Sequence, residues 1–288
     1  MKETKEGRRK KMGEERLVYS GKSKDVFEVG EGEHAGKYRL VFTDRATGYM
    51  EGGKPVFDPG YDNVVGEIPG KGAIACQFAG YFFELLRRKG IPSHYIGMVG
   101  DNEMVVEPAT PIGMPNGAAE FEGSAELQNI EFTWRNNATG SFWRRYPFVT
   151  PGKNLHKVVE AWTKGVIDIL ITFEALEAAG VMTREEIDCV DKLVRDIATI
   201  VSDQFALKSL HVIDGKFELG RLKQGDGQIV LIDEISPDVL RVCRGYSPDE
   251  NGDCRISKEC IETKLLDGKR RIKGRNQLKA SELERIFL

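Results

Sequence analysis

The feature that most limits the fold of this chain is a pair of strand-like runs, residues 211–219 and 228–235, joined by a Gly-Asp-Gly turn. Two such runs around a glycine-rich turn predict a β-hairpin. Side chains two residues apart on a strand share one face. Three charged residues of the first run have this spacing: Asp214, Lys216 and Glu218. The hairpin is therefore expected to present one charged face.

The second run is apolar over residues 229–232 and ends in the carboxylates Asp233 and Glu234. Carboxylates at the end of an apolar strand, opposite a Lys and a Glu, are a common arrangement for holding Mg²⁺ against triphosphate oxygens. A hairpin with one charged, solvated face is the alternative interpretation of the same residues. The apolar run directly before Asp233 favours the binding site.

Composition limits the class of protein. The chain has 288 residues, enough for one large domain or two lobes, and its 40% hydrophobic and 30% charged content is typical of a soluble protein. The net charge of −3 gives no indication of a nucleic-acid partner, so anionic ligands would bind through local Lys and Arg. The five cysteines are odd in number and lack CxxC spacing, which indicates neither a disulfide framework nor a zinc site. No apolar run reaches the roughly 18 residues of a membrane span and no secretory signal is visible, so a cytoplasmic protein is expected.

The hairpin also resembles a known family. VIDGKFELG followed by VLIDEISPDVLR is similar to the D-x-K-x-E-[FL]-G and D-E-x-[ST]-P-D-x-x-R pair of SAICAR synthetases. These enzymes use ATP to join aspartate to a carboxyaminoimidazole ribotide in purine synthesis. The resemblance implies that Glu218 and Asp233 hold magnesium and that Lys216 meets ATP phosphates. It gives the catalytic set as Asp214, Lys216, Glu218 and Asp233, and it places three residues toward the ribotide: Asp214, Asp238 and Arg241.

A turn over residues 20–24 lies between two strand-like runs within residues 17–29. Its backbone N–H groups and two ammonium groups suit an anion, although a solvated turn is the alternative. The turn resembles the G-K-x-K turn that the family places over ATP phosphates. The resemblance therefore assigns Lys22, Ser23 and Lys24 to ATP.

Helical spacing of apolar residues predicts a helix over residues 73–89, which Gly-Ile-Pro stops. The family has a Lys-Gly at the start of this helix, so Lys71 resembles a further nucleotide contact. In the family, the strand corresponding to residues 104–108 borders adenine, which implies packing contacts from Val105 and Val106. An ordinary buried strand is the alternative for these two residues.

Residues 132–146 resemble the family's V-R-N-x-x-A-G-S-x-x-R-R, with Arg135, Gly140 and Ser141 in place. A Gly-Ser turn flanked by arginines suits a phosphate, because guanidinium groups bind phosphate through two hydrogen bonds at once. The resemblance therefore implies that these residues bind the ribotide. Single-stranded nucleic acid, suggested by the neighbouring aromatic residues, is the alternative.

Two segments depart from the family. Asp44 remains in place and is assigned to the substrate, but residues 46–50 differ from the family's D-R-I-S-A-F-D, and Met50 stands where the family has Asp. Residues 164–168 also match poorly, and residues 51–63 are predicted to be a loop. These departures keep three other functions open: a paralogue acting on another azole nucleotide or amine, a small-molecule kinase, and a non-catalytic nucleotide-binding protein.

The resemblance implies a two-lobe α+β fold with ATP in a cleft between the lobes. We expect a flexible arm over residues 1–16, a β-rich ATP-binding lobe over 17–103 and an α+β substrate and metal lobe over 104–288. A capping box at Thr183 and Glu186 opens a long amphipathic helix that we expect to pack on a sheet. The expected cofactors are ATP and Mg²⁺, with a nucleotide and an amino acid as substrates and with neither nucleic acid nor membrane as partner. The sequence leaves open whether the protein is a homo-oligomer, and what the arm and residues 246–288 do.

Overall fold

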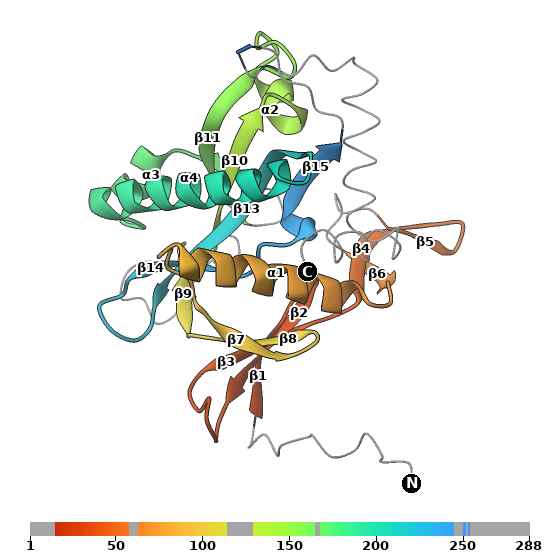
Figure 1. The fold of residues 1–288 in the computed structure, drawn as a ribbon, viewed down its shortest axis with the longest axis vertical. Coiled ribbons are helices and arrows are strands. Elements are labelled where there is room, and N and C mark those ends of the chain that lie inside the picture. Colours follow the sequence, from red (N-terminus) through yellow and green to blue (C-terminus); the bar gives the residue numbers. More distant parts are fainter. Residues whose placement is uncertain are drawn as a thin grey trace.

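The structure is a computed structural model that describes residues 15–57, 63–113, 129–164, 168–244, 250–251 and 253. Its architecture consists of two large antiparallel sheets, a small three-stranded sheet and two long helices, α1 and α4 (Figure 1). Within the described ranges, no helix is both long and apolar enough to cross a membrane. Residues 1–14 of the expected arm and most of the segment after residue 246 lie outside the described residues.

The first sheet has the strand order β1-β2-β3-β8-β7. Its strands are β1 (Glu15–Ser20), β2 (Lys24–Val29), β3 (Tyr38–Phe42), β7 (Tyr95–Gly100) and β8 (Glu103–Val106). Strand β1 begins two residues inside the expected arm, because Glu15 pairs with Arg39 and Arg16 pairs with Glu28. Strand β8 pairs with β3 and β7, so this sheet extends to Val106, past the boundary expected after residue 103.

Helix α1 (Lys71–Arg88) covers one face of the first sheet and confirms the predicted helix. The helix ends where Gly90 adopts a positive φ of 72°. At its start, a Cβ on Gly72 would lie 2.6 Å from the backbone carbonyl oxygen of Phe42. Only glycine allows the helix to approach β3 this closely. The Tyr81 hydroxyl donates to Gln204 at 2.9 Å, which joins α1 to α4.

The second sheet has the order β12-β11-β10-β13-β14, and β9 and β15 also pair with the long strand β13. Its strands are β9 (Ala109–Pro111), β10 (Ile130–Asn137), β11 (Asn154–Thr163), β12 (Leu170–Ile171), β13 (Leu210–Leu222), β14 (Ile229–Ile232) and β15 (Leu240–Arg244). Strands β13 and β14 are antiparallel neighbours, which confirms the predicted hairpin. Short helices α2 (Gly140–Arg145) and α3 (Phe173–Ala178) and the 3-10 turn Pro237–Val239 complete this part of the chain.

Helix α4 (Arg184–Ala206) packs on the second sheet and confirms the predicted amphipathic helix. Both hydrogen bonds of the capping box are present: the Thr183 side chain accepts from the N–H of Glu186, and the Glu186 carboxylate accepts from the N–H of Thr183. The face turned to the sheet buries eight residues: Ile187, Val190, Leu193, Val194, Ile197, Ala198, Val201 and Phe205.

The two faces of the second sheet differ in chemistry. Trp134 on β10 and Phe217 on β13 stack at 5.9 Å in the apolar core on one face, each at most 1% exposed. Full burial of such a ring contributes about 1.5–3 kcal/mol. The opposite face follows from the register, which pairs Glu131 with Glu218, Thr133 with Lys216 and with Glu160, and Arg135 with Asp214. Paired residues point the same way, so one face of β11, β10 and β13 is polar.

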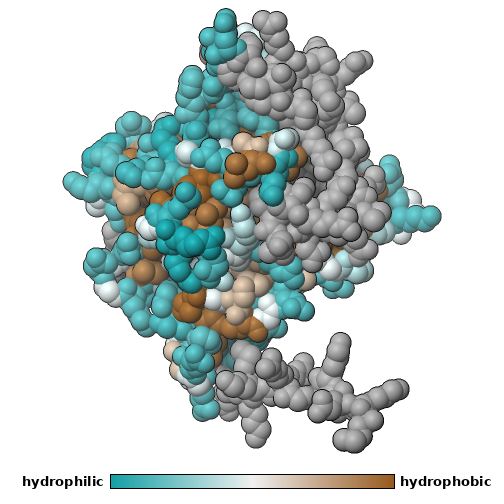
Figure 2. All heavy atoms as spheres, viewed as in Figure 1, coloured by the Kyte–Doolittle hydropathy of each residue, from teal (hydrophilic) through white to brown (hydrophobic). Residues whose placement is uncertain are grey.

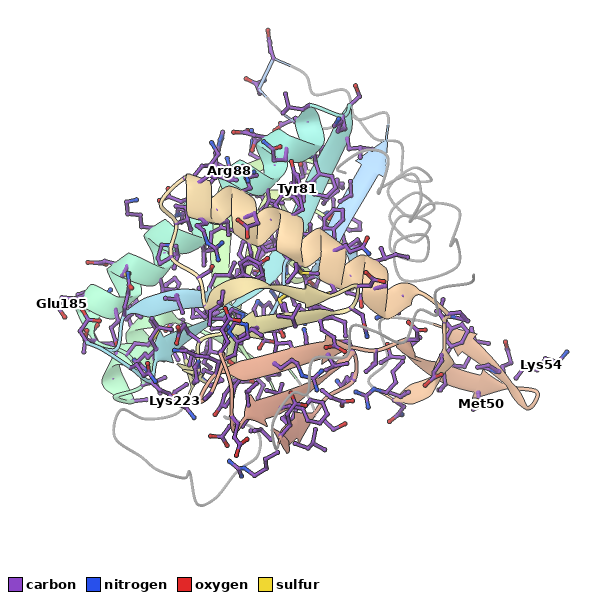
Figure 3. All side chains as sticks on the ribbon, turned by 60° about the horizontal axis from the view of Figure 1, so that its bottom comes forward. Met50, Lys54, Tyr81, Arg88, Glu185 and Lys223 are labelled. Atoms are coloured by element: carbon purple, nitrogen blue, oxygen red, sulfur yellow. The ribbon has the colours of Figure 1, made fainter. Side chains whose placement is uncertain are left out.

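The small sheet has the order β5-β4-β6, with strands β4 (Arg45–Glu51), β5 (Lys54–Phe57) and β6 (Val64–Glu67). Gly52 and Gly53 both have positive φ, as a tight two-residue hairpin turn between β4 and β5 requires. Because β5 is a strand, the loop predicted over residues 51–63 is wrong for residues 54–57. The hairpin projects from the body of the protein, with Met50 and Lys54 toward its tip (Figure 3). On the face seen in Figure 2, the margins are mostly hydrophilic and hydrophobic residues are visible in the middle. Such a mixture is usual for a protein surface.

Candidate active site

Two groups of ionisable side chains lie at the polar face of the second sheet. The carboxylate cluster consists of Lys24, Lys164, Glu218, Asp233 and Glu234. The arginine cluster consists of Arg135, Arg145, Glu160, Asp214 and Arg241. Strand β13 contributes to both, because its alternating residues Asp214, Lys216 and Glu218 point to the same side.

Lys24 joins the first sheet to the carboxylate cluster. Its ammonium group lies 2.6 Å from Asp233 and 2.7 Å from Glu234, and the residue is only 7% exposed. Burial acts to lower the pKa of Lys24, but the two carboxylates outweigh it and raise the pKa well above its usual value. The resemblance assigned Lys24 to ATP phosphates, whereas here its charge is held by the residues that follow β14.

Asp233 sits directly after the fully buried strand β14 and has a positive φ of 67°. Aspartate tolerates this left-handed conformation better than most residues. Across the hairpin, Glu218 pairs in register with Ile232, which brings its carboxylate to the same end. Glu218 accepts hydrogen bonds from Lys164 and from the Asn129 side chain.

Two of the three carboxylates of this cluster, Glu218 and Asp233, have pKa values shifted in opposite directions. Burial, together with the nearby charge of Asp233, raises the pKa of Glu218. Burial also acts to raise the pKa of Asp233, but Lys24 and Lys164 outweigh it and hold that pKa below its usual value. Asp233 is therefore the group that stays ionised most firmly.

The atoms around this pair suit an oxygen-seeking cation. Two buried oxygens, Oδ1 of Asn129 and Oε2 of Glu234, accept no hydrogen bond from any residue that the structure describes. Glu218 and Asp233 add carboxylate oxygens, and oxygen donors are the kind that Mg²⁺ prefers. Across the described part of the chain, no three His, Cys, Asp or Glu side chains already converge as a metal site. The chemistry of the donors nonetheless fits Mg²⁺.

His94 lies between β14 of the second sheet and the start of β7 in the first sheet. Its backbone N–H donates to the carbonyl oxygen of Leu231 at 2.9 Å, and its ring packs against Phe83 at 5.6 Å. Burial lowers the pKa of His94 to about 3, and its Nε2 is buried with no hydrogen-bond partner among the described residues. The ring is therefore neutral at physiological pH.

The start of α1 brings together residues that were assigned to different ligands. Lys71 pairs with Asp238 at 2.6 Å, so a predicted nucleotide contact meets a predicted ribotide contact. The Asp44 carboxylate accepts hydrogen bonds from the N–H groups of Gly70 and Gly72, at 3.0 and 2.9 Å. Asp44, which was assigned to the substrate, therefore caps the first turn of α1.

In the arginine cluster, Asp214 accepts from two arginines. Arg135 Nη1 donates to its Oδ2 at 2.9 Å, and Arg241 Nε donates to its Oδ1 at 2.5 Å. Arg135 Nη2 also donates to the Ser141 hydroxyl at 3.1 Å. Gly140 begins α2 with a φ of 52°, and a Cβ there would lie 2.6 Å from Arg241 Nη1. The predicted Gly-Ser turn is thus the start of a short helix, and Asp214 orients the arginines beside it.

Four residues of the site were missed or left unassigned from the sequence. They are Asn129, Glu131, Glu160 and Lys164. Glu131 pairs with Lys216 at 2.8 Å. Period-two spacing would have found it, because Glu131 stands four residues before Arg135 on the same strand face. Glu160 carries no such signal, since it is one acid within an otherwise apolar run.

Other predicted residues belong to neither cluster. Val105 and Val106 are buried in β8, between β3 and β7 of the first sheet, at 0% and 1% exposure. Lys22 is exposed, and the Ser23 carbonyl oxygen accepts from the N–H of Thr43 at 2.8 Å. Met50 is 57% exposed on the projecting hairpin, so its side chain points into solvent and does not line either cluster.

Comparisons with known proteins give one consistent family. A family model described as SAICAR synthetase matches residues 17–277. A phosphoribosylaminoimidazole-succinocarboxamide synthase of Clostridium tetani is 37% identical over 229 residues, which cover 78% of this chain and 91% of the relative. The enzyme of the same name from Methanopyrus kandleri is 30% identical, covering 78% and 80%. A solved SAICAR synthetase in complex with ADP is 25% identical with a TM-score of 0.62, covering 88% of this chain and 94% of that one.

Proposed function

The chain belongs to the SAICAR synthetase family, and on that premise we infer that it joins aspartate to carboxyaminoimidazole ribotide in an ATP-dependent reaction of purine synthesis. The structural observation that supports this function is the polar face of β10, β11 and β13. The carboxylate cluster, which includes Glu218 of this face and Asp233 after β14, suits Mg²⁺, and the arginine cluster suits a phosphate. The same premise places the reaction among ATP-dependent carbon–nitrogen ligases.

The reaction requires that a carboxylate be activated. A carboxylate is a poor acyl donor because oxide cannot leave. The ribotide carboxylate therefore attacks the γ-phosphorus of ATP, which forms an acyl phosphate and releases ADP. The aspartate amine then attacks the acyl carbon, phosphate leaves and the amine loses a proton, so that an amide results. The protein's part is to position the reactants and to offset the charge that gathers on the phosphates.

We assign the ATP phosphates to the carboxylate cluster, where the two large sheets meet at Lys24. Glu218 and Asp233 would hold Mg²⁺, which when bound stabilises charge on phosphoryl oxygens. The Lys216 side chain is 39% exposed on this face, where its ammonium group pairs with Glu131, and we assign it to a phosphate. Lys24, buried between its two carboxylates, acts mainly by holding Asp233 in place. Five further residues stay nucleotide contacts by proposal only: Lys22, Ser23, Lys71 and, through the backbone of their strand, Val105 and Val106.

We assign the ribotide's 5′-phosphate to the arginine cluster. Three guanidinium groups meet two carboxylates there, which leaves one positive charge in excess. Ser141 adds a hydroxyl beside Arg135. A single phosphate matches this excess better than a triphosphate does, because the latter carries more charge than the cluster can offset.

The Ser141→Asp variant tests this assignment. A carboxylate beside the arginines occupies the place of the phosphate and repels it. We expect the KM for the ribotide to rise and the KM for ATP to stay unchanged. If the KM for ATP rises and the KM for the ribotide does not, the two ligands have been assigned the wrong way round.

Omitting one substrate at a time tests the reaction itself. A ligase releases ADP only when both the ribotide and aspartate are present. A small-molecule kinase releases ADP with the acceptor alone, and a binding protein releases none. The paralogue hypothesis lost one of its two reasons when Met50 proved to point into solvent, and Lys164, from the other departing segment, reaches Glu218. The family's own substrates are therefore the first pair to assay.

A further inference from the structure

We propose that Glu160 is a positioning residue for the ribotide phosphate: its carboxylate fixes the guanidinium groups of Arg135 and Arg145 in the orientation that the phosphate needs. This proposal rests on the assignment of that phosphate to the arginine cluster. It adds a residue to which neither the motifs nor the comparisons give a role.

The carboxylate of Glu160 bridges two arginines that come from different elements. Arg135 Nε on β10 donates to its Oε2 at 2.7 Å, and Arg145 Nη2 at the end of α2 donates to its Oε1. The residue is 8% exposed. Its place is fixed by the pairing of β11 with β10, which sets Glu160 opposite Thr133, and the Thr133 hydroxyl lies 3.4 Å from Oε2. Each oxygen therefore serves one guanidinium group.

The remaining contacts of the two arginines explain why this bridge matters. Arg135 uses its other nitrogens on Asp214 and Ser141, so it is held on three sides. Arg145 instead lies against the rings of Trp162, at 4.6 Å, and Tyr146, at 5.4 Å. Flat ring faces attract a guanidinium group but do not fix its rotation in the plane. The hydrogen bond to Glu160 supplies that orientation for Arg145.

The sign of the effect separates positioning from simple charge. A carboxylate near a phosphate site repels the phosphate, so if Glu160 acted only through its charge, Glu160→Gln would strengthen ribotide binding. If Glu160 positions the arginines, the same change weakens binding. The amide keeps one acceptor oxygen and places an NH₂ group against the second arginine, where donor faces donor. The two explanations predict opposite changes in KM.

The experiment measures kcat and both KM values for Glu160→Gln in the full chain. We expect the KM for the ribotide to rise about tenfold or more, because a charge-assisted hydrogen bond that orients a binding group is lost. The KM for ATP stays as in the parent protein and kcat changes less than the ribotide KM. Glu186→Gln is the matched control, since Glu186 forms an ion pair with one arginine, Arg221, at 2.6 Å on the opposite side of β13. It should lower the melting temperature and leave both KM values unchanged.

An unchanged or lowered ribotide KM in folded Glu160→Gln overturns the proposal. If that variant does not fold, Glu160→Asp is measured in its place. It keeps the charge but is one methylene too short to reach both arginines, and the same two outcomes decide. The Ser141→Asp variant distinguishes a failure of the proposed phosphate site from a failure of the proposed role of Glu160. If it raises the ribotide KM while the Glu160 variant does not, only the role of Glu160 fails. If it leaves the ribotide KM unchanged, the phosphate site and the role of Glu160 fail together.

Discussion

Replacing Asp233 by Asn should abolish most of the activity and leave the fold intact. The change removes one negative charge and keeps the size of the side chain. Asn also tolerates the left-handed φ of 67° at this position, so the backbone after β14 needs no rearrangement. Lys24 keeps its second carboxylate, Glu234, at 2.7 Å, which preserves the contact between the two large sheets.

The magnitude follows from the proposed role of the carboxylate. Asp233 is the member of the pair whose pKa is lowered, so it supplies a full negative charge to a bound cation at neutral pH. Losing an anionic Mg²⁺ ligand reduces the stabilisation of charge that develops on the transferred phosphoryl group. A hundredfold fall in kcat corresponds to about 2.7 kcal/mol, and we expect at least that loss.

The assay combines steady-state ADP release with thermal unfolding of the same preparations. Glu186→Gln serves as the control, because it also turns the carboxylate of an ion pair into an amide but lies outside both clusters. We expect Asp233→Asn to lose activity with a nearly unchanged melting temperature, and the control to do the reverse. A folded Asp233→Asn protein with near-normal kcat refutes the magnesium assignment.

Three further predictions test the packing and electrostatics around the site. Gly72→Ala should destabilise the protein by about 1–3 kcal/mol in urea unfolding, because the new methyl meets a β3 carbonyl at 2.6 Å, whereas Gly97→Ala, with no atom within 4 Å, should cost much less. Burial lowers the pKa of His94 to about 3 and the pKa of His211 to about 4. As the pH falls below about 6.5, the unfolded chain therefore binds more protons than the folded protein does. Stability should therefore be complete above about pH 6.5 and decline toward about pH 5 by up to about 1.4 kcal/mol per pH unit for each histidine, and His94→Phe should remove its share of that slope. Lys24→Met should cost about 3–5 kcal/mol of unfolding free energy, since it leaves two carboxylates without their shared cation; a loss below about 1 kcal/mol would show that this contact does not join the sheets.

Features with a local cause were predictable from the sequence. Hydrophobic spacing and the Thr183 and Glu186 capping box predicted α4, and the glycine-rich turn predicted the pairing of β13 with β14. The alternation of Asp214, Lys216 and Glu218 predicted their common face. In each case the signal lies within one helix or one hairpin, whose residues are close both in sequence and in space.

Features that depend on pairing between distant segments were not predictable in this way. Lys24 and Asp233 are separated by 209 positions, and the sequence of the turn that contains Lys24 does not indicate that Lys24 forms a buried ion pair. Glu160 acquires its role only when β11 is set in register with β10. Asp44 matched a family motif, yet its carboxylate caps α1, because a motif gives residue types and not the direction in which a side chain points.

The central claim is that the ribotide carboxylate is activated by phosphorylation, and an oxygen label tests it most directly. The ribotide is prepared with ¹⁸O in its carboxylate and incubated with the protein, unlabelled ATP, Mg²⁺ and aspartate. We predict that each inorganic phosphate released carries one ¹⁸O, that the amide product keeps the other, and that neither product forms when aspartate or the ribotide is left out. Unlabelled phosphate, or labelled ribotide recovered with both oxygens while ADP accumulates, would contradict it.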